Sequence, residues 1–173
     1  MDNGSIISTG ISLLLGMSFG ALAMFYTLRD KLKQNQQVNS LRRIGMLEQV
    51  AQHVGKVSHT FSKYSSLVSE IGPKAEGIST KQGAELDDLS SDLVAVYEEI
   101  SIAESKLLLL GEKRLEKAMK LYTAKMAQYR KKIYPGRYSN SEEASTIKKE
   151  IITMKDQFYN ILSERYDHNN LQQ

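Results

Sequence analysis

The chain has 173 residues, a net charge of +3 and no cysteine. This length allows one domain after a short N-terminal segment. The absence of cysteine excludes a cysteine nucleophile and a lipoprotein anchor, and it fits a reducing compartment. The near-neutral charge argues against a protein dedicated to nucleic acid.

An uncharged segment occupies the N-terminal part of the chain. Residues 3–28 contain no charged side chain, and positive charge begins at Arg29. The apolar part, from Ile6 to Leu28, is about 34 Å long as a helix, which exceeds the roughly 30 Å of a hydrocarbon core. The sequence therefore predicts a transmembrane helix over residues 5–28, with the lipid bilayer as its partner.

The charges on either side of this segment predict its orientation. The residues before Ile6 include one acid and no base, whereas basic residues follow Leu28. This basic flank consists of Arg29, Lys31, Lys33, Arg42 and Arg43. Because cytoplasmic flanks collect Lys and Arg, we expect an inner-membrane protein with its N-terminus outside and its C-terminal domain in the cytoplasm.

A cleaved signal peptide is the alternative interpretation of the segment. Ala21 and Ala23 have the small-x-small pattern of a signal-peptidase site, which leaves cleavage after Ala23 open. A secretory signal also needs a basic region before its apolar core, and this segment has none. We therefore expect the segment to be retained.

Small residues recur every four positions within the predicted span, at Ser8, Ser12, Gly16 and Gly20. Gly16 and Gly20 form a GxxxG match, and small residues on one helix face let two backbones approach closely. The spacing predicts a packing face for self-association or for another membrane helix. The competing interpretation is composition alone, since glycine is common in transmembrane helices.

The rest of the chain is patterned for helices. We expect residues 29–40 to form a basic and polar stalk. They contain no helix breaker, and the sequence does not decide whether this stalk is a helix or a loop. Apolar residues then recur in steps of three and four until Gly72 and Pro73 end the pattern. This first set is Leu41, Ile44, Leu47, Ala51, Val54, Val57, Phe61, Tyr64, Val68 and Ile71.

Three further apolar stretches follow. Capping-box patterns at Ser79 with Gln82 and at Ser139 with Glu142 predict two helix starts. The second set alternates steps of three and four, as in coiled coils: Leu86, Leu89, Leu93, Val96, Ile100, Ala103, Leu107 and Leu110. The third set is Leu115, Ala118, Tyr122, Met126, Tyr129 and Ile133, and Pro135 ends it. The fourth is Ala144, Ile147, Ile151, Met154, Phe158 and Ile161.

These patterns predict an all-α fold, because no segment alternates with period two for long enough to predict a strand. Short connections favour an antiparallel bundle with coiled-coil-like packing over residues 41–167, followed by a flexible tail at 168–173. The bundle has four members if the helix breaks at Gly111 and three if the chain runs through it.

Charge is divided between neighbouring segments of the bundle. Residues 82–105 hold seven acids and no base, whereas residues 112–137 hold nine bases and two acids. A candidate patch for an anionic partner consists of Lys125, Arg130, Lys131, Lys132 and Arg137. The simpler interpretation, which we favour, is that antiparallel neighbours carry complementary charge.

Residues that catalysis or metal binding requires do not form a recognisable set. His53 and His59 are six positions apart, so they do not share one helix face. Two histidines that bind a metal from one helix are usually four positions apart. The paired Glu-x-x-His motifs of a bundle di-metal site and a nucleophile elbow are both missing from the sequence. We expect no enzymatic activity, no cofactor, no metal and no small-molecule substrate.

The order of elements resembles that of a group of small single-pass bacterial inner-membrane proteins with a cytoplasmic helical bundle. The resemblance is carried by the N-terminal span, the long helix after it, and the hinge-like run from Lys106 to Gly111 that leads into another helix. It covers most of the chain. It implies the architecture and the membrane location, but no activity and no site residues.

The leading interpretation is a non-enzymatic, membrane-anchored module whose bundle binds another protein or a second copy of itself. One alternative is a membrane-acting effector or pore component, with the Gly16 and Gly20 face driving assembly and the bundle acting as sensor. A second alternative is a membrane tether for nucleic acid through the basic helix at 112–137, which the overall charge disfavours.

Overall fold

The structure is a computed structural model of the chain. It describes residues 3–73, 78–136 and 141–170, with side chains at residues 24, 26–73, 78–136 and 141–168. The chain divides into two units, residues 1–42 and residues 43–171. Every regular element in the described ranges is a helix, so the all-α prediction is confirmed there.

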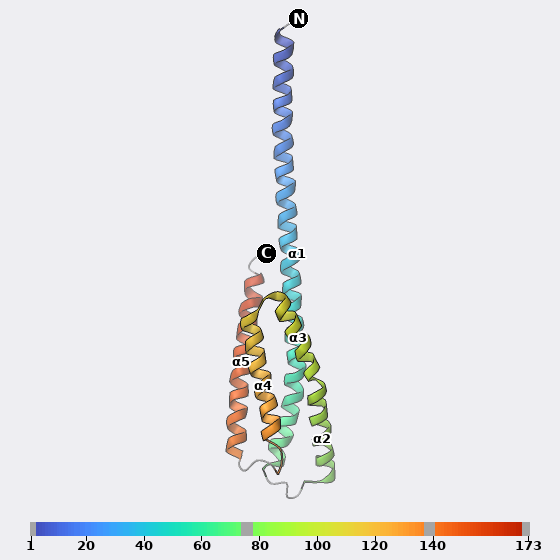
Figure 1. Cartoon of the computed structure of the whole chain (residues 1–173), viewed down its shortest axis with the longest axis vertical. Helices are drawn as coiled ribbons and strands as arrows, with labels where there is room; N and C mark the ends of the chain where they lie inside the picture. The colour runs from blue at the N-terminus through green and yellow to red at the C-terminus, as the bar shows by residue number, and fades with distance from the viewer. Residues whose placement is uncertain (1–2, 74–77, 137–140, 171–173) are drawn as a thin grey trace. The chain divides into compact units, whose positions relative to one another are not determined.

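Helix α1 (Asn3–Ile71) begins in the first unit (Figure 1). Residues 29–39 are helical and exposed, so the stalk is a helix in this unit and not a loop. Among the described residues, no helix is both long enough and apolar enough to cross a membrane. The predicted span at 5–28 lies outside the described side chains except for Met24 and residues 26–28, so it stays a prediction.

The C-terminal part of α1 belongs to the second unit and ends where the sequence predicted. Gly72 adopts a left-handed conformation with φ of +78°, and its N–H donates to the carbonyl of Val68 at 3.1 Å. Glycine adopts this conformation without the steric cost that a Cβ imposes, and Pro73 cannot continue the helix. Leu41, the first residue of the predicted apolar face, is helical but 58% exposed, and the buried apolar side chains of α1 begin at Ile44.

Helices α2 (Thr80–Ala95) and α3 (Tyr97–Leu110) follow each other with only Val96 between them. The predicted capping box at the start of α2 is confirmed: the Gln82 N–H donates to Ser79 Oγ at 3.2 Å, and the Ser79 N–H donates to Gln82 Oε1 at 3.1 Å. The break at Val96 was not predicted. The heptad pattern runs through it, which makes the two helices one member of the bundle.

Gly111 reverses the chain between α3 and α4 (Lys113–Lys132). Its φ is +71°, and the N–H groups of Gly111 and Glu112 donate to the carbonyls of Leu108 and Leu107, each at 3.0 Å. These bonds satisfy carbonyls at the end of α3 in the manner of a glycine C-cap. The question left open by the sequence is therefore answered, and the bundle has four members.

The last member is α5 (Ser141–Asn170). Its predicted cap at Ser139 lies outside the described residues. The helix extends to Asn170, which is further into the predicted flexible tail than expected, and residues 171–173 are outside the described part. The connections at the far end of the bundle meet where the Gly136 N–H donates to the Pro73 carbonyl at 3.1 Å.

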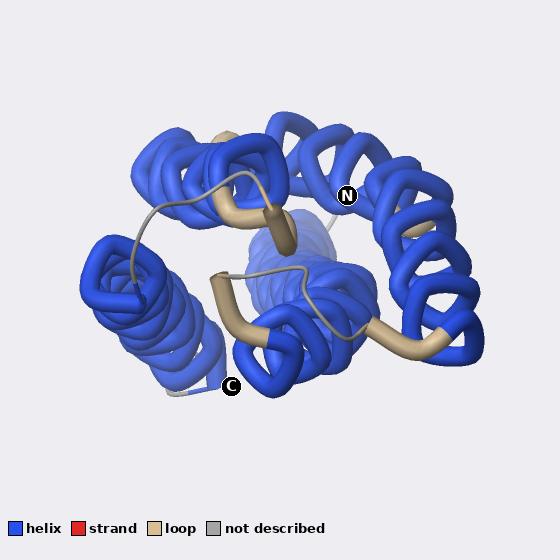
Figure 2. Tube along the Cα trace, turned by 90° about the horizontal axis from the view of Figure 1, so that it is seen from below, coloured by secondary structure: helices blue, strands red, loops and turns tan. Residues whose placement is uncertain are grey.

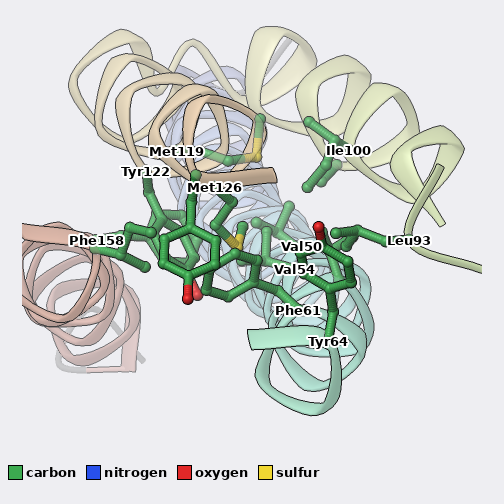
Figure 3. Packing of buried hydrophobic residues seen from close by; sticks show 14 of the residues in the cluster. Val50, Val54, Phe61, Tyr64, Leu93, Ile100, Met119, Tyr122, Met126 and Phe158 are labelled. Atoms are coloured by element: carbon green, nitrogen blue, oxygen red, sulfur yellow. The ribbon is translucent and has the colours of Figure 1, made fainter. Parts of the chain in front are cut away.

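The members of the second unit alternate in direction, up and down, around one hydrophobic core (Figures 1 and 2). Large side chains from all four members fill this core (Figure 3). Phe61 and Tyr129 pack edge to face, with their ring centroids 5.4 Å apart. Burial of these side chains, each contributing about 1.5–3 kcal/mol, is the main force that holds the members together.

Candidate interaction surfaces

Four of the five residues in the predicted basic flank are exposed on α1: Arg29, Lys31, Lys33 and Arg42. Arg43, the fifth, lies in the second unit and has a structural role there. Its guanidinium donates to the carbonyl of Leu110 at 3.3 Å and to the carboxylate of Glu112 at 3.1 Å. Arg43 therefore holds the α3–α4 turn against α1 as well as adding to the local positive charge.

Glu112 is the centre of this cluster, and no pattern in the sequence pointed to it. Its carboxylate is only 10% exposed and receives Arg43 on Oε1 and Arg165 on Oε2, the latter at 3.0 Å. A buried carboxylate is tolerated when charge-assisted hydrogen bonds compensate its lost hydration. The cluster thus joins α1, the turn and α5 at one end of the bundle.

The predicted transmembrane packing face lies outside the part of the chain whose side chains are described. The backbone at Ser8, Ser12, Gly16 and Gly20 is helical within α1. Helical geometry agrees with a face at four-residue spacing. Whether another helix packs there stays a prediction.

Most of the candidate anionic-partner patch interacts within the chain itself. Lys125 pairs with Glu150 at 2.5 Å, Lys132 with Glu143 at 4.0 Å, and Arg130 donates to Ser90 Oγ at 3.2 Å. Lys131 is exposed, and Arg137 lies outside the described residues. These contacts favour the interpretation that α4 carries charge complementary to its neighbours.

The histidines form no metal site in the described residues, where no group of three or more His, Cys, Asp or Glu side chains gathers to hold an ion. His53 Nδ1 instead forms a short hydrogen bond to Glu99, which also accepts from Lys56 Nζ at 3.0 Å. These bonds from His53 and Lys56 lower the pKa of the Glu99 carboxyl. The cluster links α1 to α3 and keeps this carboxylate charged.

Tyr122 in the core and the partly buried Tyr97 are packing groups whose hydroxyls form hydrogen bonds. Tyr122 donates to Ser58 Oγ at 2.9 Å, and Tyr97 donates to the carbonyl of Thr123 at 3.1 Å. Burial raises the pKa of Tyr97 to about 12, and it also raises the pKa of Tyr122 and Tyr159. A phenol with a raised pKa stays neutral at physiological pH, which suits a structural role better than a reactive one.

Several surfaces of the second unit expose apolar groups, and two of them lie beside α4 and on α3. The first is a groove of about 410 Å³ between α4 and α5, lined by Leu121, Met154 and Ile161 with Arg114 and Lys117 beside them. The second is the outer side of α3, where Ile102 is 38% exposed, Leu108 57% and Leu109 78%. Both are candidate surfaces for a protein partner.

Comparison of the chain with protein-family models, with curated protein sequences and with solved structures gives no match. The resemblance described from the sequence therefore stays an expectation. The function has to be argued from the chain's own residues.

Proposed function

We propose that this protein is a membrane-anchored, non-enzymatic interaction module whose helical bundle binds another protein or a second copy of itself. The observation that carries the proposal is the uncharged run at residues 3–28, which is followed directly by exposed basic residues on a helical stalk. An uncharged run of this length with a basic cytoplasmic flank is the pattern of a retained single-pass anchor.

The four-membered bundle supports the interaction part of this proposal. Its core is filled by packing side chains, and its grooves are shallow spaces between helices lined by mixed polar and apolar residues. The exposed leucines of α3 supply apolar area of the kind that protein partners cover. The intramolecular partners of Lys125, Arg130 and Lys132 leave fewer free cations for nucleic acid than the sequence suggested.

Extraction of the full chain from membranes with alkaline carbonate tests the anchor. We expect the protein to stay in the membrane pellet, and Leu14→Lys with Leu15→Lys to release it, since each lysine near a helix centre costs about 2.5–3.5 kcal/mol of insertion free energy. The matched control is Gln34→Lys with Gln36→Lys, which places the same charges in the stalk and leaves the protein in the pellet. Extraction of the unsubstituted chain by carbonate would contradict the proposal.

A further inference from the structure

Helix α2 is held in the bundle by fewer buried side chains than the two helices that follow it. Of its 16 residues, only Leu86 and Leu93 are buried, and Leu89 is partly buried. By contrast, α3 buries four of its 14 residues and α4 buries six of its 20. Because the burial of apolar side chains is the main force that holds a helix in a bundle, α2 is the most weakly attached of these three helices.

Polar contacts add little to the attachment of α2. Arg130 donates to Ser90 Oγ at 3.2 Å, and Tyr134 donates to Asp87 Oδ1 at 3.2 Å on the exposed surface. Ion pairs join α1 to α3, α3 to α4 and α4 to α5. Within the described part of the chain, none joins α2 to any other helix.

A groove of about 510 Å³ separates part of α2 from α1. Its charged lining residues are Lys63 and Glu70 of α1 with Glu85 and Asp88 of α2. These are three acids and one base, and like charges on facing helices disfavour their close approach. The two helices are therefore not closely packed along this side.

The chain has a break at each end of α2. At the C-terminal end, Val96 separates α2 from α3, and no side chain caps the start of α3 there. Directly beyond the break, α3 is fixed to α4 because Tyr97 donates to the carbonyl of Thr123 at 3.1 Å. At the N-terminal end, the capping box between Ser79 and Gln82 starts α2 as a separate helix. A change of backbone angles at Val96 can therefore move α2 and leave α3 in place.

The composition of α2 gives it little stability of its own. Six of its 16 residues are of types that stabilise a helix interior poorly: Gly83, Asp87, Asp88, Ser90, Ser91 and Asp92. Isolated helices of about this length are marginal in water even when they consist of good helix formers. The helical state of α2 therefore depends on its contact with the core.

We propose that α2 is a lid that opens about Val96 while the other helices of the second unit keep their core. In the closed state Leu93 points toward Tyr64 of α1, and both side chains are fully buried (Figure 3). Opening exposes this apolar part of the core to solvent. Elements that move in this way come from the least stable part of a protein. Opening does not depend on the membrane anchor, because all of these residues belong to the second unit.

Hydrogen exchange of the full-length chain, followed by mass spectrometry, tests the lid. After correction for intrinsic rates, we expect interior amides of α2 to exchange at least about tenfold faster than those of α3 and α4. Equal rates in α2 and α4 would overturn the proposal, since α2 would then open only when the whole bundle unfolds.

Two glycine substitutions distinguish opening of α2 from unfolding of the whole bundle. A Cβ added at Gly83 meets only the side chain of Ile78, at 4.0 Å, so alanine fits there and should slow exchange in α2 about fivefold. Gly45→Ala is the matched control, because it stabilises α1, which stays folded when the lid opens. It should slow the slowest amides of α3 and α4 several-fold and leave α2 unchanged. Slower exchange of α2 in Gly45→Ala, or an unchanged rate in Gly83→Ala, would contradict the lid.

Thiol labelling gives a second measurement, because the chain has no cysteine of its own. Leu86 of α2 and Leu107 of α3 are equally buried, at 1% and 0% exposure, so Leu86→Cys and Leu107→Cys remove the same group from matched positions. We expect a thiol reagent to modify Leu86→Cys at least about tenfold faster than Leu107→Cys. Equal rates of modification would overturn the proposal.

Discussion

Glu112 illustrates how single residues organise this bundle. Its side chain is 10% exposed, and it directly follows Gly111, where the chain reverses. Its carboxylate lies between Arg43 of α1 and Arg165 of α5, two helices that are distant in sequence. Arg43 also donates to the last carbonyl of α3, so one side chain caps that helix and neutralises the buried acid. The cluster fixes the α3–α4 turn against both α1 and α5.

Replacing Glu112 tests the importance of this cluster for stability. We expect Glu112→Gln to lower the free energy of unfolding by about 2 kcal/mol, because hydrogen bonds to charged groups contribute about 1.5–3 kcal/mol each and the amide accepts more weakly. Urea denaturation of the purified chain measures the change. The matched control is Glu164→Gln, whose partner Arg114 is 3.9 Å away and whose side chain is 64% exposed. This exposed pair should contribute less than about 0.5 kcal/mol; equal effects of the two changes would contradict the assigned role.

At the scale of elements, glycines decide where members of the bundle begin and end. Gly72 and Gly111 both adopt positive φ at the C-terminal ends of helices, and no atom lies within 4 Å of a Cβ added at either one. Glycine is therefore required at these two positions by the positive φ of the backbone and not by a lack of space for a side chain. Gly45, inside α1, has the same open surroundings without a positive φ.

This contrast predicts opposite effects of the same substitution. Gly111→Ala should destabilise the bundle by about 1–2 kcal/mol, which is the cost of a left-handed conformation for an L residue with a Cβ. Gly45→Ala should stabilise it by about 0.5–1 kcal/mol, because alanine loses less conformational freedom in a helix. Thermal and urea denaturation measure both. A neutral Gly111→Ala variant would mean that the turn is not as described.

Local signals in the sequence were enough for most element boundaries. The stops at Gly72 and Pro135 and the capping box at Ser79 depend on neighbouring residues only, so they were readable without the fold. The contact of Arg43 with Glu112 joins residues about seventy positions apart, so the count of basic residues after the uncharged run could not reveal it. Lys125 and Arg130 were part of the predicted patch for an anionic partner. Their partners Glu150 and Ser90 come from other helices, so the sequence did not reveal these contacts.

At the scale of the whole molecule, a packed helical bundle follows a predicted membrane anchor. Its interior is filled by core side chains, so its outer surfaces are where it meets partners. On the described surface, apolar groups meet solvent at Leu108 and Leu109 of α3 and in the groove between α4 and α5. An anchor would confine copies to the plane of one membrane, which raises their effective concentration for each other.

Reporter fusions at the C-terminus of the full chain test the proposal that a membrane anchor holds the bundle on the cytoplasmic side. We expect a periplasmic phosphatase fused there to be inactive, and a fluorescent protein fused at the same point to be fluorescent and to stay in the membrane fraction. An active phosphatase, or a fluorescent fusion in the soluble fraction, would contradict it.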